Sequence, residues 1–156
     1  MATIVDDDRG IPAFRVLVVE DFEPFRQFIC SKLRENPDLR LICEVADGLE
    51  AVRKAEELQP DLLLVDVGLP TLNGIEATRQ IRKLVPQTKI VFVSQESSAD
   101  VVADAFRLGA MGYVAKTDAG SDLLLAVSAA LRGERFASSK FADYCFIGAS
   151  KAVVNC

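Results

Sequence analysis

Short apolar runs alternate along the chain with longer segments in which apolar residues recur at helical spacing. Runs rich in β-branched residues predict strands, and the amphipathic segments predict helices. Turn residues such as Asn36-Pro37 separate them. The pattern predicts strands at 14–19, 39–45, 62–65, 89–93 and 112–115. It predicts helices that begin near Pro24, at 49–58, 75–85 and 99–108, and after a cap at Ser121.

The five strands and five helices alternate strictly, so each pair of strands needs a crossover connection and the strands run parallel. The run at 62–65 (LLLV) is apolar throughout, which is typical of a central strand covered on both faces. The predicted fold class is therefore α/β, with helices on both faces of a five-stranded sheet. We expect one domain at 14–133, a flexible or disordered tail at 1–13, and a linker-like tail at 134–156 with no complete output domain.

Composition narrows the classes of function. The 156 residues include no histidine, which excludes His-based triads, His zinc ligands and His general bases. A formal net charge of -5 argues against free-standing nucleic-acid binding. The four cysteines are scattered without a Cys-x-x-Cys pair, which argues against zinc and dithiol chemistry. We see no signal peptide and no apolar run near the roughly 20 residues that span a bilayer, so we expect a cytoplasmic protein with free thiols and no membrane contact.

Polar residues follow four of the five predicted strands. Glu20-Asp21 follows the first strand, Asp66 the third, Ser94 the fourth and Lys116 the fifth. A carboxylate after a strand is by itself usually a turn or cap residue. In an open α/β sheet, however, ligands bind beyond the carboxyl ends of the strands, so these residues should converge at one edge.

Three carboxylates, a hydroxyl and a lysine form a chemically coherent set. Clustered carboxylates repel one another, so they need a cation at neutral pH. Oxygen ligands without His or Cys favour a hard ion, and Mg²⁺ is the usual partner of phosphates. The ammonium and the hydroxyl suit phosphoryl oxygens. The set predicts phosphoryl transfer to a carboxylate, with catalysis by positioning and charge neutralisation.

Several stretches resemble response-regulator receiver domains of two-component systems. They are VLVVEDFEPFR, DLLLVDVGLPTLNGIEATRQIR, IVFVSQ and GAMGYVAKT, in the family's order and spacing over residues 14–133. GAMGYVAK and the following GERFASS are most similar to receivers of LuxR-type transcriptional regulators. The resemblance implies a flavodoxin-like (CheY-like) doubly wound sheet with strand order 2-1-3-4-5.

The resemblance also implies roles for the strand-end residues. Asp66 would be the phosphoacceptor, taking the phosphoryl group from a phosphohistidine of a sensor histidine kinase. Asp21, Asp66 and the backbone carbonyl of Gly68 would hold Mg²⁺, and Glu20 would act mainly through water. Lys116 would pair with the phosphoryl group.

Two residues would carry the conformational switch implied by the resemblance. Ser94 would turn inward to bind the phosphoryl group, and Tyr113 would change rotamer in step, altering the surface of the fourth helix, fifth strand and fifth helix. Gln95, where the family often has a small residue, and Glu96, which could orient water, would set the lifetime of phospho-Asp66. Such a chain phosphorylates and slowly dephosphorylates itself, and we do not expect it to be an enzyme in the multiple-turnover sense.

The sequence leaves two possibilities for what the receiver controls. GERFASS resembles the start of the linker in LuxR-type regulators, which favours the receiver part of a DNA-binding transcription regulator. The alternative is a stand-alone receiver that signals by binding a partner. The chain contains no recognisable helix-turn-helix, so we expect no DNA binding by this chain alone. Receivers of this type often dimerise when phosphorylated, which makes a homodimer an expectation to test.

Two other functions fit the pattern less well. A haloacid-dehalogenase-like phosphatase also has a nucleophilic Asp after an apolar strand, but it needs a second Asp two residues later, where this chain has Gly68. Flavodoxin-type cofactor binding needs a phosphate-cradling Ser/Thr/Gly loop after the first strand, and the residues there are Glu20-Asp21.

Overall fold

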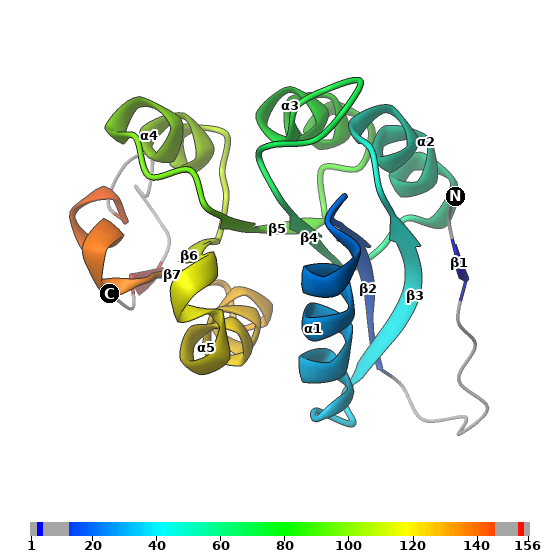
Figure 1. Ribbon diagram of the computed structural model, residues 1–156, viewed down its shortest axis with the longest axis horizontal. Helices are drawn as coiled ribbons and strands as arrows, with labels where there is room; N and C mark the ends of the chain where they lie inside the picture. The colour runs from blue at the N-terminus through cyan, green and yellow to red at the C-terminus, as the bar shows by residue number, and fades with distance from the viewer. Residues whose placement is uncertain (1–2, 5–12, 146–152, 155–156) are drawn as a thin grey trace.

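The computed structural model describes residues 3–4, 13–145 and 153–154. Each predicted strand is present, and helices cover the sheet on both faces (Figure 1). The elements of the domain are β2 (Phe14–Val19), α1 (Glu23–Arg34), β3 (Leu39–Val45), α2 (Gly48–Leu58), β4 (Leu62–Val65), α3 (Gly74–Leu84), β5 (Lys89–Ser94), α4 (Ala99–Arg107), β6 (Gly112–Ala115) and α5 (Ala119–Leu131).

The parallel core of the sheet runs β3-β2-β4-β5-β6, which confirms the predicted order 2-1-3-4-5. The prediction of five strands in total is wrong, because the described residues form a sheet of eight. A strand β7 (Glu134–Ala137) lies parallel to β6, and β8 (Val153–Val154) pairs with β7. At the other edge, β1 (Thr3–Ile4) pairs antiparallel with β3.

Two apolar clusters hold the helices against the sheet. On one face, α1 and α5 cover a cluster that includes Leu33 and Leu123. On the other face, α2, α3 and α4 cover a cluster that includes Ile81 and Phe106 (Figure 1). All four side chains of β4 are buried, as expected for a central strand between two helical layers.

Local sequence signals set the helix starts. Asp47, Asn73 and Ser98 each precede a helix and accept a hydrogen bond from a backbone N–H three residues later. Pro24 lies in the first turn of α1, where its missing N–H leaves no hydrogen bond unmade. The predicted cap at Ser121 is wrong: α5 begins at Ala119, and the Ser121 hydroxyl donates to the backbone carbonyl of Asp118.

The cysteines follow the expectation of free thiols only in part. Cys30 and Cys43 are buried free thiols. Burial raises the pKa of Cys30 to about 12, so this thiol stays protonated and unreactive at neutral pH. The expectation is wrong for Cys145, which is disulfide-bonded. Cys156 lies outside the described residues.

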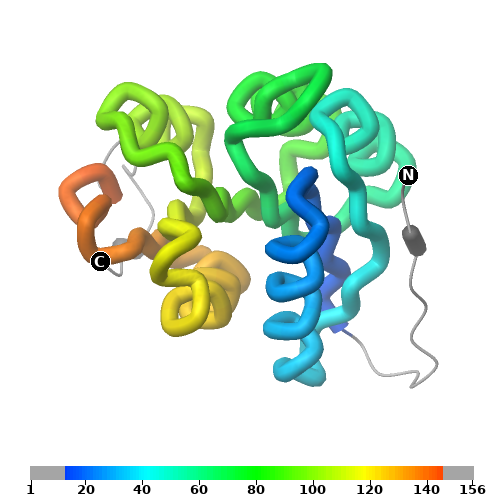
Figure 2. Tube along the Cα trace, viewed as in Figure 1, coloured from blue at the N-terminus to red at the C-terminus, as the bar shows by residue number. Residues whose placement is uncertain are grey.

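Residues 134–145, which follow α5, are folded against the sheet. Beyond β7 it forms a short 3₁₀ helix, η2 (Ser139–Tyr144), which contacts α4. Figure 2 shows this part of the trace, in orange, at the end of the sheet away from the N-terminus. Residues 134–145, called the C-terminal segment below, thus extend the domain by a strand and a helical turn.

Candidate functional site

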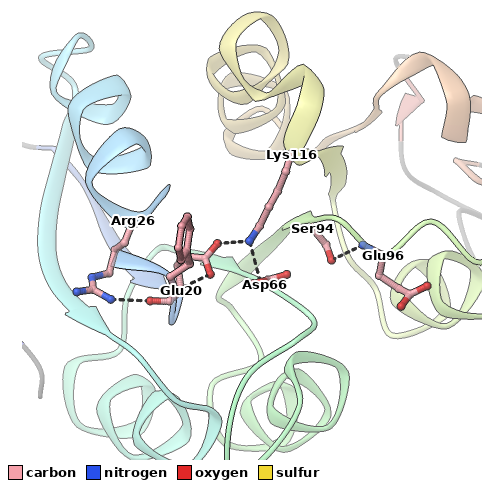
Figure 3. Close-up of polar contacts among 7 residues, drawn as sticks. Glu20, Arg26, Asp66, Ser94, Glu96 and Lys116 are labelled. Carbon is pink, nitrogen blue, oxygen red and sulfur yellow. Dashed lines mark hydrogen bonds and ion pairs between the residues drawn. The ribbon is translucent and has the colours of Figure 1, made fainter. Parts of the chain in front are cut away.

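The predicted residues meet at the carboxyl edge of the sheet. Glu20 follows β2, Asp66 follows β4, Ser94 ends β5 and Lys116 follows β6. Figure 3 shows the side chains of these residues approaching one another from the ends of their strands. The parallel register causes this, because it brings the ends of neighbouring strands to one level.

Three carboxylates form a cluster that suits a cation. Oxygens of Glu20, Asp21 and Asp66 all lie within 4.8 Å of one another. Glu20 and Asp66 are buried, with 0% and 7% of their surface exposed, whereas Asp21 is open to solvent. A hard divalent cation would relieve their repulsion, and an all-oxygen donor set with an open side is typical of Mg²⁺ sites.

Lys116 neutralises part of this cluster. Its Nζ lies 2.6 Å from Glu20 Oε1 and 3.0 Å from Asp66 Oδ2 (Figure 3). Burial alone would lower the pKa of Lys116, but the contacts with both carboxylates outweigh it and raise this pKa above its usual value. The ammonium therefore stays charged and serves as the fixed cation of the site.

Glu20 is held beneath the site by several contacts. Burial raises the pKa of its carboxyl from 4.5 to about 7; Lys116 opposes this shift and the Asp66 charge adds to it. The backbone N–H of Phe22 donates to Glu20 Oε2 at 3.2 Å, and Arg26 Nη1 donates to the Glu20 backbone carbonyl at 2.8 Å. Sequence reasoning missed Arg26, because it contacts Glu20 through the main chain. An arginine in the first turn of a helix gives no indication of such a contact.

A glycine lets α3 approach the back of Asp66. A Cβ on Gly74 would lie 1.9 Å from the Asp66 backbone oxygen. The Gly74 N–H donates to the carbonyl of Val67 at 2.7 Å, which closes the loop after β4. The Asp66 N–H donates to the Val19 carbonyl at 3.1 Å, so Asp66 is held by β2 as well as by its own strand, β4.

A cavity of about 480 Å³ opens above these groups. Its walls combine acidic, hydroxyl and ammonium groups with an aromatic ring, from Asp21, Phe22, Asp66, Val67, Gly68, Ser94, Gln95, Glu96 and Lys116. It thus joins a cation-binding carboxylate cluster to hydrogen-bond donors in one space. Glu20 lies below this cavity and does not line it, so it can act on the cavity only through Lys116, a cation or water.

Comparison with known proteins decides the family. The sequence model of the response regulator receiver domain family matches residues 16–128 of this chain. The chain belongs to the response regulator receiver domain family. The resemblance found in the sequence is therefore confirmed.

Curated relatives of this receiver are longer regulators. Transcriptional regulatory protein LiaR of Bacillus subtilis is 37% identical over 128 residues, covering 82% of this chain and 61% of that protein. Response regulator protein VraR of Staphylococcus aureus is 38% identical over 120 residues, covering 77% and 57%. The chain thus spans about three fifths of the length of these curated relatives.

Solved structures agree with the fold. A LuxR-family two-component response regulator from Aurantimonas sp. superimposes with a TM-score of 0.80 at 32% identity, covering 85% of this chain and 95% of that one. The isolated receiver of RcsB from Salmonella enterica serovar Typhimurium gives a TM-score of 0.79 over 85% of this chain and 98% of that one. At 19% identity, the second match shows the fold alone. In the described part of this receiver, no helix is long and apolar enough to cross a membrane.

The two predicted switch residues of the receiver are linked through a loop. The Glu96 N–H donates to Ser94 Oγ at 3.0 Å, and Tyr113 donates its hydroxyl to the Glu96 carbonyl at 2.7 Å. Tyr113 is fully buried, with its ring 5.9 Å from that of Phe92. Burial raises the Tyr113 pKa to about 12, so its phenol remains a hydrogen-bond donor. Gln95 is exposed and lines the cavity, and its predicted effect on attacking water stays a prediction.

The raised pKa of Glu20 predicts a pH-dependent stability in the absence of metal. Because the folded-state pKa lies above the unfolded one, this group stabilises the fold fully below about pH 4.5, and the contribution is lost as pH rises to about 7. The loss has an upper limit of about 3 kcal/mol. In urea unfolding with EDTA, the free energy of unfolding of the wild type should fall across this pH range, and that of Glu20→Gln should fall less. Saturating Mg²⁺ should make the fall in the wild type smaller. Equal slopes in wild type and Glu20→Gln would contradict the assignment.

The close approach of α3 predicts a strong effect of one added methyl group. Gly74→Ala should lower the free energy of unfolding by about 1–3 kcal/mol, because α3 must move away from the Asp66 backbone. The matched control is Gly68→Ala, where a Cβ meets no heavy atom within 4 Å. Urea midpoints measure both, and a Gly74→Ala midpoint no lower than that of Gly68→Ala would show that α3 relaxes freely.

Proposed function

We propose that this receiver accepts a phosphoryl group on Asp66 from a phosphohistidine of a sensor histidine kinase. The main support is the geometry at Asp66. Its carboxylate is almost fully buried, lies within 4.8 Å of two other carboxylates, and accepts a hydrogen bond from Lys116 at the wall of an open cavity. This combination gives a nucleophile, a place for a cation and a fixed positive charge at one point.

The phosphoryl transfer is an in-line displacement at phosphorus. An Asp66 carboxylate oxygen attacks phosphorus, and the Asp66 O–P bond forms as the P–N bond to the kinase imidazole breaks. The electron pair of that bond remains on the imidazole nitrogen, which takes up a proton. A bound Mg²⁺, held by Asp21, Asp66 and the Gly68 carbonyl with Glu20 acting through water, would neutralise charge on the phosphoryl oxygens.

The chain's own donors complete the site. Lys116 Nζ already lies at 3.0 Å from Asp66 Oδ2, so a small movement lets it donate to a phosphoryl oxygen. The Ser94 hydroxyl accepts from Glu96 and still has its own proton to donate into the cavity. Two donors that line the same cavity as Asp66 would favour the phosphorylated form by charge and orientation.

Phosphorylation then acts as a population shift of a protein-interaction surface around α4, β6 and α5, through Ser94 and Tyr113. For a mostly inactive ensemble, the phosphoryl contacts must favour the active state by about 5 kcal/mol. The site turns over only by slow autodephosphorylation, at a rate set by Gln95 and Glu96, so the chain is not an enzyme in the usual sense. Such a switch acts in the cytoplasm.

We infer that the output is transcriptional. The similarity to LuxR-family regulators and to the longer LiaR and VraR supports a receiver that controls a DNA-binding part. This chain with its net charge of -5 would not bind DNA by itself, and phosphorylation would promote a homodimer. The alternative output is a stand-alone receiver that binds a partner protein.

The assignment of Asp66 predicts where label is taken up. Wild-type protein with radiolabelled acetyl phosphate and Mg²⁺ should become labelled, and Asp66→Asn should fall to background because the nucleophile is lost. Asp104→Asn, at an exposed carboxylate on α4, is the matched control and should label like wild type. Label in Asp66→Asn at the wild-type level would overturn the mechanism, and continuous release of phosphate from phosphomonoesters would favour a phosphatase.

The role of Lys116 predicts labelling without full switching. Lys116→Ala should still be modified at Asp66, but the phosphoryl group would lose its link to β6. The chain has two tyrosines, so ¹⁹F NMR of fluorotyrosine-labelled protein gives two lines, of which Tyr144→Phe identifies Tyr113. Beryllofluoride should move the Tyr113 line in wild type and move it less in Lys116→Ala. An equal displacement in both proteins would remove Lys116 from the switch.

A further inference from the structure

The C-terminal segment is an integral part of the sheet edge beside the switch. Its strand β7 pairs with β6, with Gly112 opposite Phe136 and Tyr113 opposite Ala137. Figure 1 shows η2 beyond this strand, next to α4. The segment therefore covers part of the region through which the receiver would signal.

Buried side chains anchor the segment. Phe141 is 3% exposed and packs into the apolar cluster beneath α2, α3 and α4. Arg135 is also 3% exposed, and its guanidinium donates to the carbonyls of Phe106 at the end of α4 and Cys145 at the end of η2. It also lies over the Phe106 ring, 5.4 Å from its centroid. These contacts fix η2 against α4.

One set of contacts leads from the segment to Lys116. Ser138 is fully buried, and its Oγ accepts from the Ala115 N–H at 3.1 Å and donates to Asp122 Oδ2 at 2.8 Å. The backbone pairing of β6 with β7 stops at Tyr113, so the hydroxyl takes the place of the next ladder bond. Ala115 immediately precedes Lys116, whose ammonium contacts Asp66. Ser138 thus fixes the strand end that carries the cation of the site.

A second set leads to Ser94. The Phe141 ring meets the Tyr113 ring edge-on, with 5.0 Å between the ring centroids, and the Phe92 ring stacks on Tyr113 at 5.9 Å. Tyr113 donates to the Glu96 carbonyl, and the Glu96 N–H donates to Ser94 Oγ. Phe141 thus stabilises the buried rotamer of Tyr113, in which the tyrosine holds the loop after β5.

We propose that Ser138 and Phe141 are positioning residues for phosphoryl capture, so that docking of the C-terminal segment and phosphorylation of Asp66 stabilise each other. The inference rests on the proposed function. Both donors that flank Asp66 are fixed through the segment, one by hydrogen bonds through Ala115 and one by ring packing through Tyr113. A docked segment presents donors already ordered, which lowers the entropy lost when a phosphoryl group binds.

Thermodynamic linkage gives the proposal a test on the unmutated protein. If docking favours phosphoryl capture, phosphoryl capture must favour docking by the same factor. Beryllofluoride with Mg²⁺ should therefore slow amide hydrogen exchange across residues 134–145 by about five-fold or more. Exchange in this segment that is unchanged or faster would overturn the proposal. A wild-type protein that binds no beryllofluoride at all would overturn the proposed function and this inference with it.

Variants test the two links separately. Phe141→Ala and Ser138→Ala should each weaken beryllofluoride binding by about five- to thirty-fold, measured by ¹⁹F NMR titration. Phe141→Ala should leave Mg²⁺ affinity without beryllofluoride within two-fold of wild type, since it does not touch the carboxylates. The control is Leu33→Ala, a buried apolar truncation on α1, under conditions in which circular dichroism shows all variants folded.

The outcomes separate positioning from general destabilisation. Leu33→Ala should bind beryllofluoride like wild type, although it loses comparable stability. If it weakens beryllofluoride as much as Phe141→Ala does, or if Phe141→Ala and Ser138→Ala bind like wild type, the segment has only a structural role and the proposal fails. In that case a wild-type protein that still captures beryllofluoride leaves the proposed function intact.

Discussion

The contact of one partly buried ammonium with two buried carboxylates is the interaction on which the site depends. Lys116 lies within 3.0 Å of both Glu20 and Asp66, and without this charge two buried carboxylates would repel each other at low dielectric. Burial raises the pKa of Glu20 to about 7, the Asp66 charge adds to this shift, and the contact with Lys116 offsets it only in part. A divalent cation would add positive charge that both these carboxylates and a phosphoryl group need.

The fold brings these charged groups together at one edge of the sheet. Fully apolar strands such as β4 are buried along their whole length, and a polar residue such as Asp66 follows directly after the strand. The parallel register then brings these polar residues to one edge of the sheet. The glycine at the start of α3 lets that helix press on the Asp66 backbone. Asp66 is therefore held among packed elements, while Asp21 and Gln95 remain accessible at the cavity.

Much of this could be predicted from the sequence. Hydrophobic periodicity gave the order and type of the main elements, and polar residues after apolar strands identified the site, because both are local patterns with a simple physical cause. The C-terminal segment could not be predicted in the same way. ERFA is short, and β7 forms because β6 offers an unpaired edge, which is a property of the assembled sheet.

The residues missed by sequence reasoning share this dependence on tertiary context. Arg26 acts through a main-chain carbonyl, Ser138 replaces a ladder bond, and Phe141 packs on a ring from a distant strand. Ser121 looked like a helix cap, but α5 begins two residues earlier, directly after the 3₁₀ turn η1 (Lys116–Asp118). Helix boundaries are the least certain part of such predictions, because neighbouring turns compete for the same residues.

Under the proposed function, the Asp66 carboxylate forms the acyl phosphate. Borohydride reduces an aspartyl phosphate to homoserine and leaves a free carboxylate unchanged, so the modified position can be read from peptide masses. Protein treated with acetyl phosphate and Mg²⁺ and then reduced should contain homoserine at position 66, in an amount that falls when Mg²⁺ is removed by EDTA. Homoserine at another aspartate, with residue 66 unchanged, would contradict the account.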